Sequence, residues 1–335
     1  LKQQGVTIVL ITHKLREIMA VTDYVSVMRR GAMVAHVETK ATSESQLAEY
    51  MVGRKVLLDV SKTEVQTGDV VLKIKQLNWF DEQGVARLKN INFDIRAGEV
   101  LGVAGVSGNG QSQLLEVLSG IAPIQDGSIA IKDQIFSSKQ QSSPAQMRYM
   151  GMAHVPEDRH KQGMIMDFSA AETAILGYHT DAELNNGLWL KPERVQQRCA
   201  DLMQAFDVRP DDVQLKSANF SGGNQQKLIL AREMEHGPDV LLIGQPTRGV
   251  DVGAIEFIHQ RILDMRDAGK AVLLVSVELE EILSLSDRII VLCDGEITGR
   301  MEAEDADERT LGMLMANAHQ AHDPLQSKEQ GEVQA

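Results

Sequence analysis

The sequence predicts an α/β protein built on a mainly parallel sheet, and two observations carry this prediction. Short apolar segments alternate with amphipathic segments of helical period along most of the chain, as in folds whose strands are joined by covering helices. In addition, a glycine-rich turn at residues 105–110 joins the apolar segment 100–104 to a helix that should begin at Gln111. This strand, turn and helix have the spacing of a phosphate-binding P-loop, so the expected fold class is α/β of the P-loop NTPase type.

Composition and charge restrict the possible partners and location. The 335 residues are 43% hydrophobic, enough for a sizeable core, and their 34 basic and 47 acidic side chains give a net charge of −13. That charge argues against nucleic acid as a partner of the whole surface. No apolar run approaches the roughly 18 residues that a membrane span needs. Cys199 and Cys293 have no paired spacing, so we expect buried thiols in a reducing compartment and a cytoplasmic protein.

An internal repeat indicates two related domains. Residues 5–31 resemble residues 269–295 at a constant offset of 264 positions, with glycines and an aspartate in the same register. Each copy has the pattern of a buried strand, a short amphipathic helix, a second strand and a glycine turn. We therefore expect residues 1–58 to be the end of a first domain, most of which would precede Leu1. A polar linker is expected at residues 59–69.

The second domain is expected over residues 70–316, followed by a disordered polar tail at residues 317–335. The stretch between residues 168 and 219 is expected to be largely helical and to form an insertion between two halves of the sheet. Apolar runs predict the strands, and apolar periodicity predicts the helices. Strands are predicted at residues 70–74, 91–95, 100–104, 128–131, 152–155 and 240–243, and helices at residues 192–206 and 251–268.

The glycine-rich turn is the first candidate binding site. A loop of this kind points several backbone N–H groups inward, and the helix that follows adds the positive end of its dipole, so that phosphate oxygens are bound by dipoles. A P-loop also has a lysine directly before its hydroxyl residue, and this chain has Gln111 there. The hydroxyl of Ser112 remains a weak candidate ligand for Mg²⁺. The predicted nucleotide-binding residues of the loop are Gly105, Ser107, Gly108, Asn109, Gly110, Gln111, Ser112 and Gln113.

Two further stretches follow in a specific order. Residues 221–226 read SGGNQQ and stand directly before an apolar-periodic helix, where a serine N-cap and two glycines expose backbone N–H groups. An apolar strand at residues 240–243 comes next, and the loop after it contains PTRGVD at residues 246–251. A helix cap alone would be an ordinary feature. The P-loop, SGGNQQ and PTRGVD in this order are a far more specific signal.

This combination of motifs resembles the ATP-binding subunits of ABC transporters. The closer resemblance is to the tandem-domain subunits of importers for simple sugars and nucleosides, whose motifs include SGGNQQK, PTRGVD and VPEDR, the last at residues 155–159 here. The resemblance covers essentially residues 1–315. It implies the ABC ATPase fold, with a mainly parallel sheet, an antiparallel β part and a helical signature subdomain at about residues 168–236. In that family two ATP sites form in a head-to-tail dimer, and each pairs the P-loop of one domain with the signature loop of the other.

The same resemblance identifies four departures at positions that carry chemistry. Gln111 stands in place of the lysine that neutralises the phosphates, and Gly244 stands in place of the aspartate that holds Mg²⁺. Gln245 stands in place of the glutamate that activates the attacking water, and Val277 in place of the switch histidine. Phosphoryl transfer needs positive charge on the phosphates and an oriented nucleophile. We therefore predict that this P-loop does not hydrolyse ATP efficiently, while its backbone still offers a binding site.

Other family positions are retained. Asp251 matches the D-loop aspartate, and His13, the counterpart of Val277 in the first copy, matches the switch histidine of the first domain. The signature loop is intact, and the resemblance places it against the γ-phosphate bound by the first domain. Its residues are Ser221, Gly222, Gly223, Asn224 and Gln225.

Weaker predictions concern the surroundings of the P-loop. Either Trp79 or Phe80 is a candidate for stacking on adenine, with core packing as the alternative. Glu157 of the VPEDR segment is expected to line the nucleotide site and the groove for a membrane subunit, with an exposed turn that binds no ligand as the alternative. His154 and His160 lack metal-type spacing and are expected to face solvent.

The resemblance implies an energy-coupling ATPase subunit of an importer for a simple sugar or a nucleoside, using ATP and Mg²⁺. Its implied partners are the missing first nucleotide-binding domain or a second copy, integral membrane permease subunits and, indirectly, a substrate-binding protein. We therefore expect a cytoplasmic protein bound peripherally to the inner face of the cell membrane, and a chain that alone is hydrolysis-deficient. The alternative is a non-catalytic regulatory or structural ABC domain without ATP turnover. The net charge and the sequences of the SGGNQQ and PTRGVD motifs disfavour a soluble ABC protein acting on ribosomes or DNA.

Overall fold

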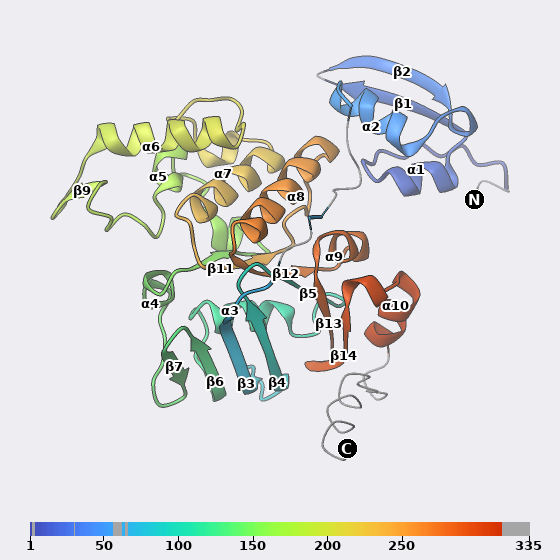
Figure 1. Ribbon diagram of the computed structural model, residues 1–335. Helices are drawn as coiled ribbons and strands as arrows, with labels where there is room; N and C mark the ends of the chain where they lie inside the picture. Colours follow the sequence, from blue (N-terminus) through green and yellow to red (C-terminus); the bar gives the residue numbers. More distant parts are fainter. Residues whose placement is uncertain (2–3, 30, 56–61, 64–65, 317–335) are drawn as a thin grey trace.

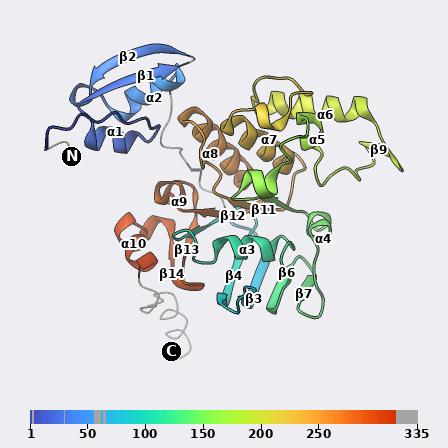
Figure 2. The same cartoon turned by 180° about the vertical axis from the view of Figure 1, so that it is seen from behind.

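The computed structural model describes residues 1, 4–29, 31–55, 62–63 and 66–316. Up to residue 55 these residues form a small N-terminal unit, and from residue 70 they form a larger domain. Figures 1 and 2 show the N-terminal unit beside α8 (Val252–Asp267) and α9 (Leu279–Leu285) of the larger domain. The antiparallel sheet of the larger domain lies at the far end of the molecule from that contact.

The N-terminal unit consists of two short helices packed on a two-stranded antiparallel sheet. The Ser43 side chain caps the second helix by accepting a hydrogen bond from the Gln46 N–H at 3.3 Å. A small apolar core lies between the layers and includes Leu47, which is fully buried. The elements are α1 (Leu15–Val21), β1 (Tyr24–Arg29), β2 (Ala32–Glu38) and α2 (Glu44–Val52).

Each of these elements recurs in the larger domain at the offset of 264 residues that the sequence shows. Both antiparallel strand pairs also carry an irregularity at the same place, between Val27 and Met28 and between Val291 and Leu292. The two copies therefore share their local structure in detail. The recurring elements are α9, β13 (Arg288–Cys293), β14 (Glu296–Glu302) and α10 (Glu308–Ala316).

One part of the repeat prediction is wrong. The repeat predicts a buried strand at residues 6–11, but the structure shows an irregular segment in which Val9 is 86% exposed and Ile11 is 96% exposed. The counterpart in the larger domain, β12 (Ala271–Ser276), is completely buried, with strands paired on both sides. A central strand needs hydrogen-bonding neighbours on both edges, and the described residues of the N-terminal unit supply none to this segment.

The larger domain is built on a six-stranded sheet, as the alternation of strands and helices predicts. Its strand order is β14-β13-β5-β12-β11-β8, and every neighbouring pair is parallel except β13 with β14. The carboxyl ends of the parallel strands meet at one edge, where ligands bind in open α/β sheets. The strands not yet bounded are β5 (Val100–Ala104), β8 (Met152–Val155) and β11 (Val240–Gly244).

The predicted antiparallel β part is a four-stranded sheet with the order β4-β3-β6-β7. Its first two strands are longer than the sequence predicts, because they pair with each other up to the turn at residues 81–85. Helices α3 (Gln111–Leu118) and α4 (Pro144–Tyr149) follow in the same half of the domain (Figure 1). The strands are β3 (Val70–Phe80), β4 (Ala86–Arg96), β6 (Asp126–Ile131) and β7 (Gln134–Ser137).

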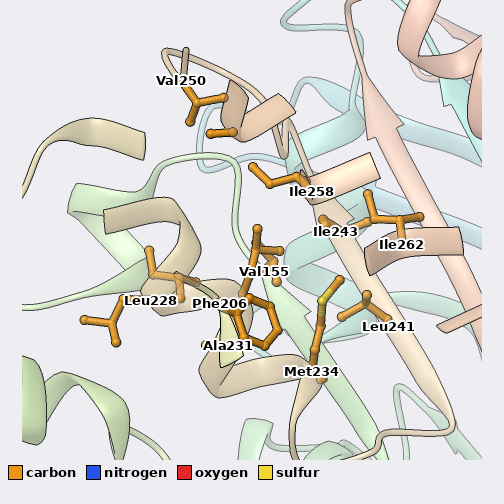
Figure 3. Close-up of a cluster of buried hydrophobic side chains, with 14 of the residues drawn as sticks. Val155, Phe206, Leu228, Ala231, Met234, Leu241, Ile243, Val250, Ile258 and Ile262 are labelled. Carbon is orange, nitrogen blue, oxygen red and sulfur yellow. The ribbon is translucent and has the colours of Figure 1, made fainter. Parts of the chain in front are cut away.

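Two apolar cores lie on the two faces of the central sheet, because its strands are apolar on both faces. In β11, Leu241 and Ile243 belong to one core, and Val240 and Leu242 belong to the other. Figure 3 shows part of the first core, where Leu241 and Ile243 meet Ile258 and Ile262 of the covering helix α8. The second core joins the central sheet to the antiparallel sheet. The P-loop strand is therefore held between two packed layers.

The region at residues 168–219 is less helical than predicted. A short hairpin of β9 (Asn185–Asn186) and β10 (Trp189–Leu190) separates its two helices, because the Asn-Gly pair before β10 favours a tight turn. Apolar side chains of the second helix recur at helical spacing and are buried. The helices of this half of the domain are α5 (Ala170–Ala174), α6 (Pro192–Ala205) and α7 (Gly222–Met234).

The predicted linker and tail fall largely outside the described residues. Of the linker predicted at residues 59–69, Thr63 is bound to the larger domain, because Arg266 donates a hydrogen bond to its carbonyl oxygen at 2.8 Å. The tail predicted at residues 317–335 lies outside the described residues. The division of the chain at residues 58 and 70 stays a prediction.

Candidate functional site

The P-loop follows the carboxyl end of β5 and leads directly into α3. Gly108 and Gly110 have φ values of 95° and 106°, a region that side-chain-bearing residues rarely adopt. A Cβ atom at Gly110 would also lie 2.4 Å from the carbonyl oxygen of Arg87. The loop is therefore shaped by its glycines, and α3 begins at Gln111 as the sequence predicts. The free N–H groups of the first turn of α3 face this loop.

Gln111 is folded back beneath the loop. Its side chain is buried, and its Nε2 donates a hydrogen bond to the Val106 carbonyl oxygen at 3.0 Å. A Cβ atom at Gly105 would lie 2.3 Å from the same Nε2, so the amide packs directly against the start of the loop. The Gln111 Oε1 is buried and has no hydrogen-bond partner. This neutral amide cannot supply the positive charge that phosphate binding by a P-loop lysine provides.

Ser112 and Glu157 contact each other across the edge of the sheet. Ser112 lies in the first turn of α3, and Glu157 follows β8 in the VPEDR segment. The Ser112 hydroxyl donates a short hydrogen bond to the Glu157 carboxylate. The structure thus places Glu157 beside the P-loop, where the sequence expected it to line the site. The contact brings a hydroxyl and a carboxylate, both oxygen ligands, to one point.

Gly244, at the end of β11, has no room for a side chain. A Cβ atom there would lie 2.5 Å from the Glu157 Cγ and 2.8 Å from the Leu115 Cδ1. An aspartate at this position would therefore collide with Glu157. The sequence showed only that an acidic residue was absent from position 244. The structure adds that Glu157 fills the space and brings its own carboxylate to Ser112.

Gln245 and Val277 are joined to each other. Gln245 has a φ of 49°, and its N–H donates to the Val275 carbonyl oxygen at 2.8 Å. Its Oε1 accepts a hydrogen bond from the Val277 N–H at 3.4 Å. The side chain is buried and occupied by this backbone contact. Neither residue carries a titratable group, so neither can accept a proton from a water molecule.

A pocket of about 150 Å³ lies beside Ser112. It is lined by three carboxylates against one lysine, so the side chains around it are mainly acidic. The pKa of Asp158 is held below its usual range by hydrogen bonds from the backbone N–H groups of Lys161 and His160. The lining residues are Ser112, Leu115, Glu116, His154, Glu157, Asp158, Lys161 and Gln162.

His154 corrects one prediction. The sequence predicts a solvent-facing side chain, but the residue is only partly exposed, and its Nε2 is buried without a hydrogen-bond partner. Burial lowers its pKa to about 4, because a low-dielectric surrounding disfavours the charged form. β8 carries His154, and alternation along this strand turns the side chain toward α3 and α4. His160 is exposed as predicted, although it also makes a hydrogen bond.

The signature loop opens α7. The sequence places its two glycines before the helix, whereas α7 begins at Gly222, so both glycines belong to its first turn. Ser221 occupies the N-cap position without a side-chain capping bond; its hydroxyl accepts a hydrogen bond from Asn224 Nδ2 at 2.9 Å. The Asn224 Oδ1 accepts from the Arg209 N–H at 2.7 Å. These bonds fix the loop and leave the N–H groups of the first helical turn available for an anion.

Arg159 ties the signature loop to the PTRGVD loop. Its Nη1 donates to the Arg248 carbonyl oxygen at 2.9 Å, and its Nε donates to the Gln225 Oε1 at 3.3 Å. The Gln225 Nε2 in turn donates to the Ser217 carbonyl oxygen at 3.0 Å. VPEDR therefore reaches the P-loop through Glu157 and the signature loop through Arg159. The sequence did not indicate the second role, because its only signal was an acidic and a basic residue two positions apart.

Of the remaining predicted site residues, Asp251 lies beside the signature loop, where a Cβ atom at Gly223 would be 3.4 Å from its Oδ2. His13 is exposed on the N-terminal unit, next to α1. Asp251 caps α8 by accepting a hydrogen bond from the Ala254 N–H at 3.1 Å. At the end of β3, Trp79 is partly buried against the core of the antiparallel sheet, and Phe80 is 46% exposed. Phe80 therefore has the more open face of the two candidates for stacking.

Three further observations concern metal ligands, cysteines and membrane-spanning helices. The described residues contain no group of three or more histidine, cysteine or acidic side chains that could hold a metal ion. Cys199 and Cys293 are free and buried, as predicted. Among the helices described by the structure, none is long and apolar enough to cross a membrane.

Residues 88–248 match the ABC transporter family. The chain is 41% identical over 317 residues to NupA, a nucleoside import ATP-binding protein of Lactococcus lactis, a match covering 95% of this chain and 62% of that protein. It is also 41% identical over 323 residues to TsgD13, a glucose import ATP-binding protein of Haloferax volcanii, covering 96% of this chain and 58% of that protein. The chain thus spans about three fifths of the length of these relatives.

Solved structures of ATP-binding cassettes have a similar fold. A nucleotide-free cassette from an ABC transporter aligns with a TM-score of 0.60 at 18% identity, covering 75% of this chain and 97% of that chain. A dimeric cassette in a post-hydrolysis state, bound to ADP and Pi, aligns with a TM-score of 0.59 at 23% identity, covering 69% of this chain and 98% of that chain. The predicted fold class, α/β of the ABC ATPase type, is therefore confirmed.

Proposed function

We propose that the chain, whose residues 88–248 match the ABC transporter family, is part of the ATP-binding, energy-coupling subunit of an importer for a nucleoside or a simple sugar. The names of relatives such as NupA and TsgD13 support this substrate class. Membrane permease subunits, and indirectly a substrate-binding protein, would be the partners. The chain would then work at the inner face of the cell membrane.

Within this role, we infer that the P-loop of the larger domain binds nucleotide without hydrolysing it efficiently. The main support is that the positions expected to carry catalytic residues hold neutral side chains, which are hydrogen-bonded to the backbone. The Gln111 amide is bound to the Val106 carbonyl, and the Gln245 amide accepts from the Val277 N–H. Both amides are neutral, so neither can neutralise the γ-phosphate or accept a proton from the attacking water. The glycine-shaped backbone that binds phosphate is retained.

Ser112 and Glu157 are the residues that would hold Mg²⁺ beside the loop. Their contact presents a hydroxyl and a carboxylate, and Mg²⁺ takes such oxygen ligands together with substrate phosphates. Gly244 offers no oxygen from its side chain, and Glu157 fills the space that an aspartate would need. When bound, the ion would neutralise charge on the phosphate oxygens of the nucleotide.

The signature loop would serve a second site together with a first nucleotide-binding domain or a second copy. Its first turn offers N–H groups and the Ser221 hydroxyl to the γ-phosphate of that site. His13 would act there as the switch histidine, because it stands where Val277 stands in the other copy. The assembly would then be asymmetric, with one hydrolytic site and one site that binds without turnover.

The altered residues at positions 111, 244, 245 and 277 also favour a second candidate function. The larger domain would be a non-catalytic ABC domain that completes and regulates the site of its partner and never turns over ATP. The acidic pocket beside Ser112, and the absence of a lysine at position 111, weaken binding of a phosphate without a metal ion. The two candidates differ in whether this P-loop binds nucleotide at all.

Equilibrium binding of ATP to the chain, with Mg²⁺ and with EDTA, separates these candidates. We expect saturable ATP binding with an affinity that Mg²⁺ increases. In Glu157→Gln this increase should be about tenfold smaller, because a charged ligand of the ion becomes neutral. In EDTA the same variant should bind ATP more tightly than the wild type, because one repelling carboxylate is gone. Glu116→Gln, which alters another carboxylate of the pocket, is the matched control and should stay within about twofold of the wild type. Absence of any binding favours the non-catalytic candidate.

A reconstruction variant examines whether the site depends on a partner. Gln111→Lys, Gly244→Asp and Gln245→Glu together should give little ATP turnover in the chain alone. The opposing signature loop is missing from the isolated site, and Glu157 occupies the space of the new aspartate. Vigorous turnover by the monomeric variant would contradict the composite site.

A further inference from the structure

Two equivalent segments, the starts of α1 and α9, contact each other where the N-terminal unit meets the larger domain, beside the packing of that unit on α8. α1 and α9 occupy the same place in the two copies, 264 positions apart. Lys14 Nζ lies 3.2 Å from Glu278 Oε1, and these two residues are also 264 positions apart. The Arg16 guanidinium forms an ion pair with Glu280, which is again its own counterpart. Each residue thus meets the residue that takes its place in the other copy.

A contact between equivalent residues has a specific geometric meaning. In a two-fold symmetric pairing, a residue on the axis meets its own copy. The pairs Lys14–Glu278 and Arg16–Glu280 show that the two repeats meet in this way, around an approximate two-fold axis between α1 and α9. In Figures 1 and 2, α1 and α9 lie at the boundary between the N-terminal unit and the larger domain. Two identical copies of α1, or two of α9, would therefore meet through this same face if they associated.

The charges on the two helices are opposite at both equivalent positions. α1 presents Lys14 and Arg16, and α9 presents Glu278 and Glu280. Arg16 also pairs with Glu308, the first residue of α10, at 2.9 Å. If a second α9 replaced α1, glutamate would face glutamate at every one of these contacts. If a second α1 replaced α9, lysine would face lysine and arginine would face arginine, and only Glu44, the counterpart of Glu308, would keep an attraction to Arg16.

We propose that the face formed by α1 and α9 is a pairing surface that accepts only unlike repeats. The basic face of the first repeat, Lys14 and Arg16, binds the acidic face of the second, Glu278 and Glu280. The same charges oppose association of two larger domains, or of two N-terminal units, through this surface. Specificity arises from the repulsion in the wrong pairs as well as the attraction in the right one. This inference concerns the pairing of domains and does not depend on nucleotide chemistry.

The exposure of these side chains sets the expected size of the effect. All five are half exposed or slightly more, so each ion pair contributes little by itself. Reversing the charge of one face replaces several attractions by repulsions, and the resulting change in the pairing equilibrium should be at least about tenfold at low salt. Salt at about 1 M should remove most of that change, because exposed charges are screened.

Distance measurements between spin labels on the full chain test the attraction. Labels at Met33→Cys on β2 and Tyr149→Cys at the end of α4 report docking, and both sites are exposed, whereas the native cysteines are buried. We expect Lys14→Glu with Arg16→Glu to lower the ratio of docked to undocked molecules at least about tenfold. Adding Glu278→Lys and Glu280→Arg should restore the ratio. An unchanged ratio, or no recovery in the full swap, would overturn the proposal.

A matched control separates local pairing from net charge. Arg209→Glu with Lys216→Glu changes the net charge by the same amount at equally exposed positions, whose ion pairs lie within the larger domain. This variant should keep the docking ratio of the wild type. A loss of docking as large as that of the α1 variant would attribute the effect to general repulsion and would contradict the proposal.

Mixing two variants tests the rejection of like faces. One chain carries Lys14→Glu and Arg16→Glu, so both of its faces are acidic, and the other carries Glu278→Lys and Glu280→Arg, so both are basic. Sedimentation should show association in the mixture that is at least about tenfold tighter than in either chain alone. Equal association of each chain with itself, or none in the mixture, would contradict a surface that selects unlike repeats.

Discussion

Residues 5–52 and 269–316 are two copies of one structural unit in different surroundings. Their helices and strands have the same bounds at an offset of 264 residues. Only the second copy contains the buried strand β12, which pairs with β5 and β11. In the first copy the matching segment is irregular and exposed. Local sequence therefore specifies the helix, hairpin and final helix, while the central strand also requires neighbours that another part of a domain supplies.

The two copies differ more in their functional side chains than in their backbones. His13 in the first copy corresponds to Val277 in the second, and the basic face of α1 corresponds to the acidic face of α9. In the proposed assembly both differences would act on pairing: the histidine would belong to a site that another domain completes, and the charges would select that domain. The copies have kept their architecture and changed the groups that contact a partner.

The largest expected difference between the copies concerns one leucine. Leu274 in β12 is fully buried, whereas its counterpart Leu10 is 47% exposed. Leu274→Ala should lower the free energy of unfolding by about 2–5 kcal/mol, because it leaves a cavity, and Leu10→Ala by at most about 0.5 kcal/mol. Urea denaturation measures both. Similar losses at the two positions would show that residues 6–11 are packed in solution.

Acid should act on the larger domain and spare the N-terminal unit. The pKa of His154 is lowered to about 4 from a usual value near 6.5, so below that usual value the unfolded chain binds a proton that the fold does not. Stability is therefore complete above pH 6.5 and falls as the pH drops toward 4. We expect about 2 kcal/mol to be lost between pH 7.5 and pH 5.

Urea titrations at several pH values test whether His154 causes this pH dependence of stability. His154→Gln should reduce it, and His236→Gln, at a second histidine whose pKa burial lowers, should also reduce it. An unchanged pH dependence in His154→Gln would contradict this assignment.

A smaller difference is expected at the glycine turn of each copy. Gly31 and Gly295 have φ values of 78° and 77°, so alanine is strained at both by about 1 kcal/mol. A Cβ atom at Gly295 would in addition lie 2.6 Å from the Arg87 carbonyl oxygen, whereas nothing lies within 4 Å of one at Gly31. Gly295→Ala should therefore cost about 2 kcal/mol more than Gly31→Ala in denaturant unfolding. Equal costs would mean that the contact with Arg87 relaxes freely.

Much of the fold could be predicted because its signals are local. The strand at residues 100–104, the glycine turn and the helix at Gln111 are continuous in sequence, and they form β5, the P-loop and α3 as predicted. The repeat predicted the N-terminal elements for the same reason. The strand expected at residues 6–11 was wrong, because its pattern indicates burial but does not show whether a neighbouring strand is present.

The missed features of the site are contacts between distant segments. Position 244 differs from position 157 by 87 residues, and only the structure shows that Glu157 fills the space beside Gly244 and bonds to Ser112. Arg159 likewise reaches Gln225 and Arg248. His154 lies in a strand whose burial depends on α3 and α4, so its lowered pKa had no sequence signal.

The central claim is that the P-loop of the larger domain binds nucleotide without efficient turnover. Phosphate release by the purified chain, measured beside the binding of a fluorescent ATP analogue that ATP displaces, tests it directly. The account predicts saturable binding, with phosphate release in the wild type no faster than in Gln111→Ala. Substantial release by the wild-type chain that Gln111→Ala abolishes would contradict it.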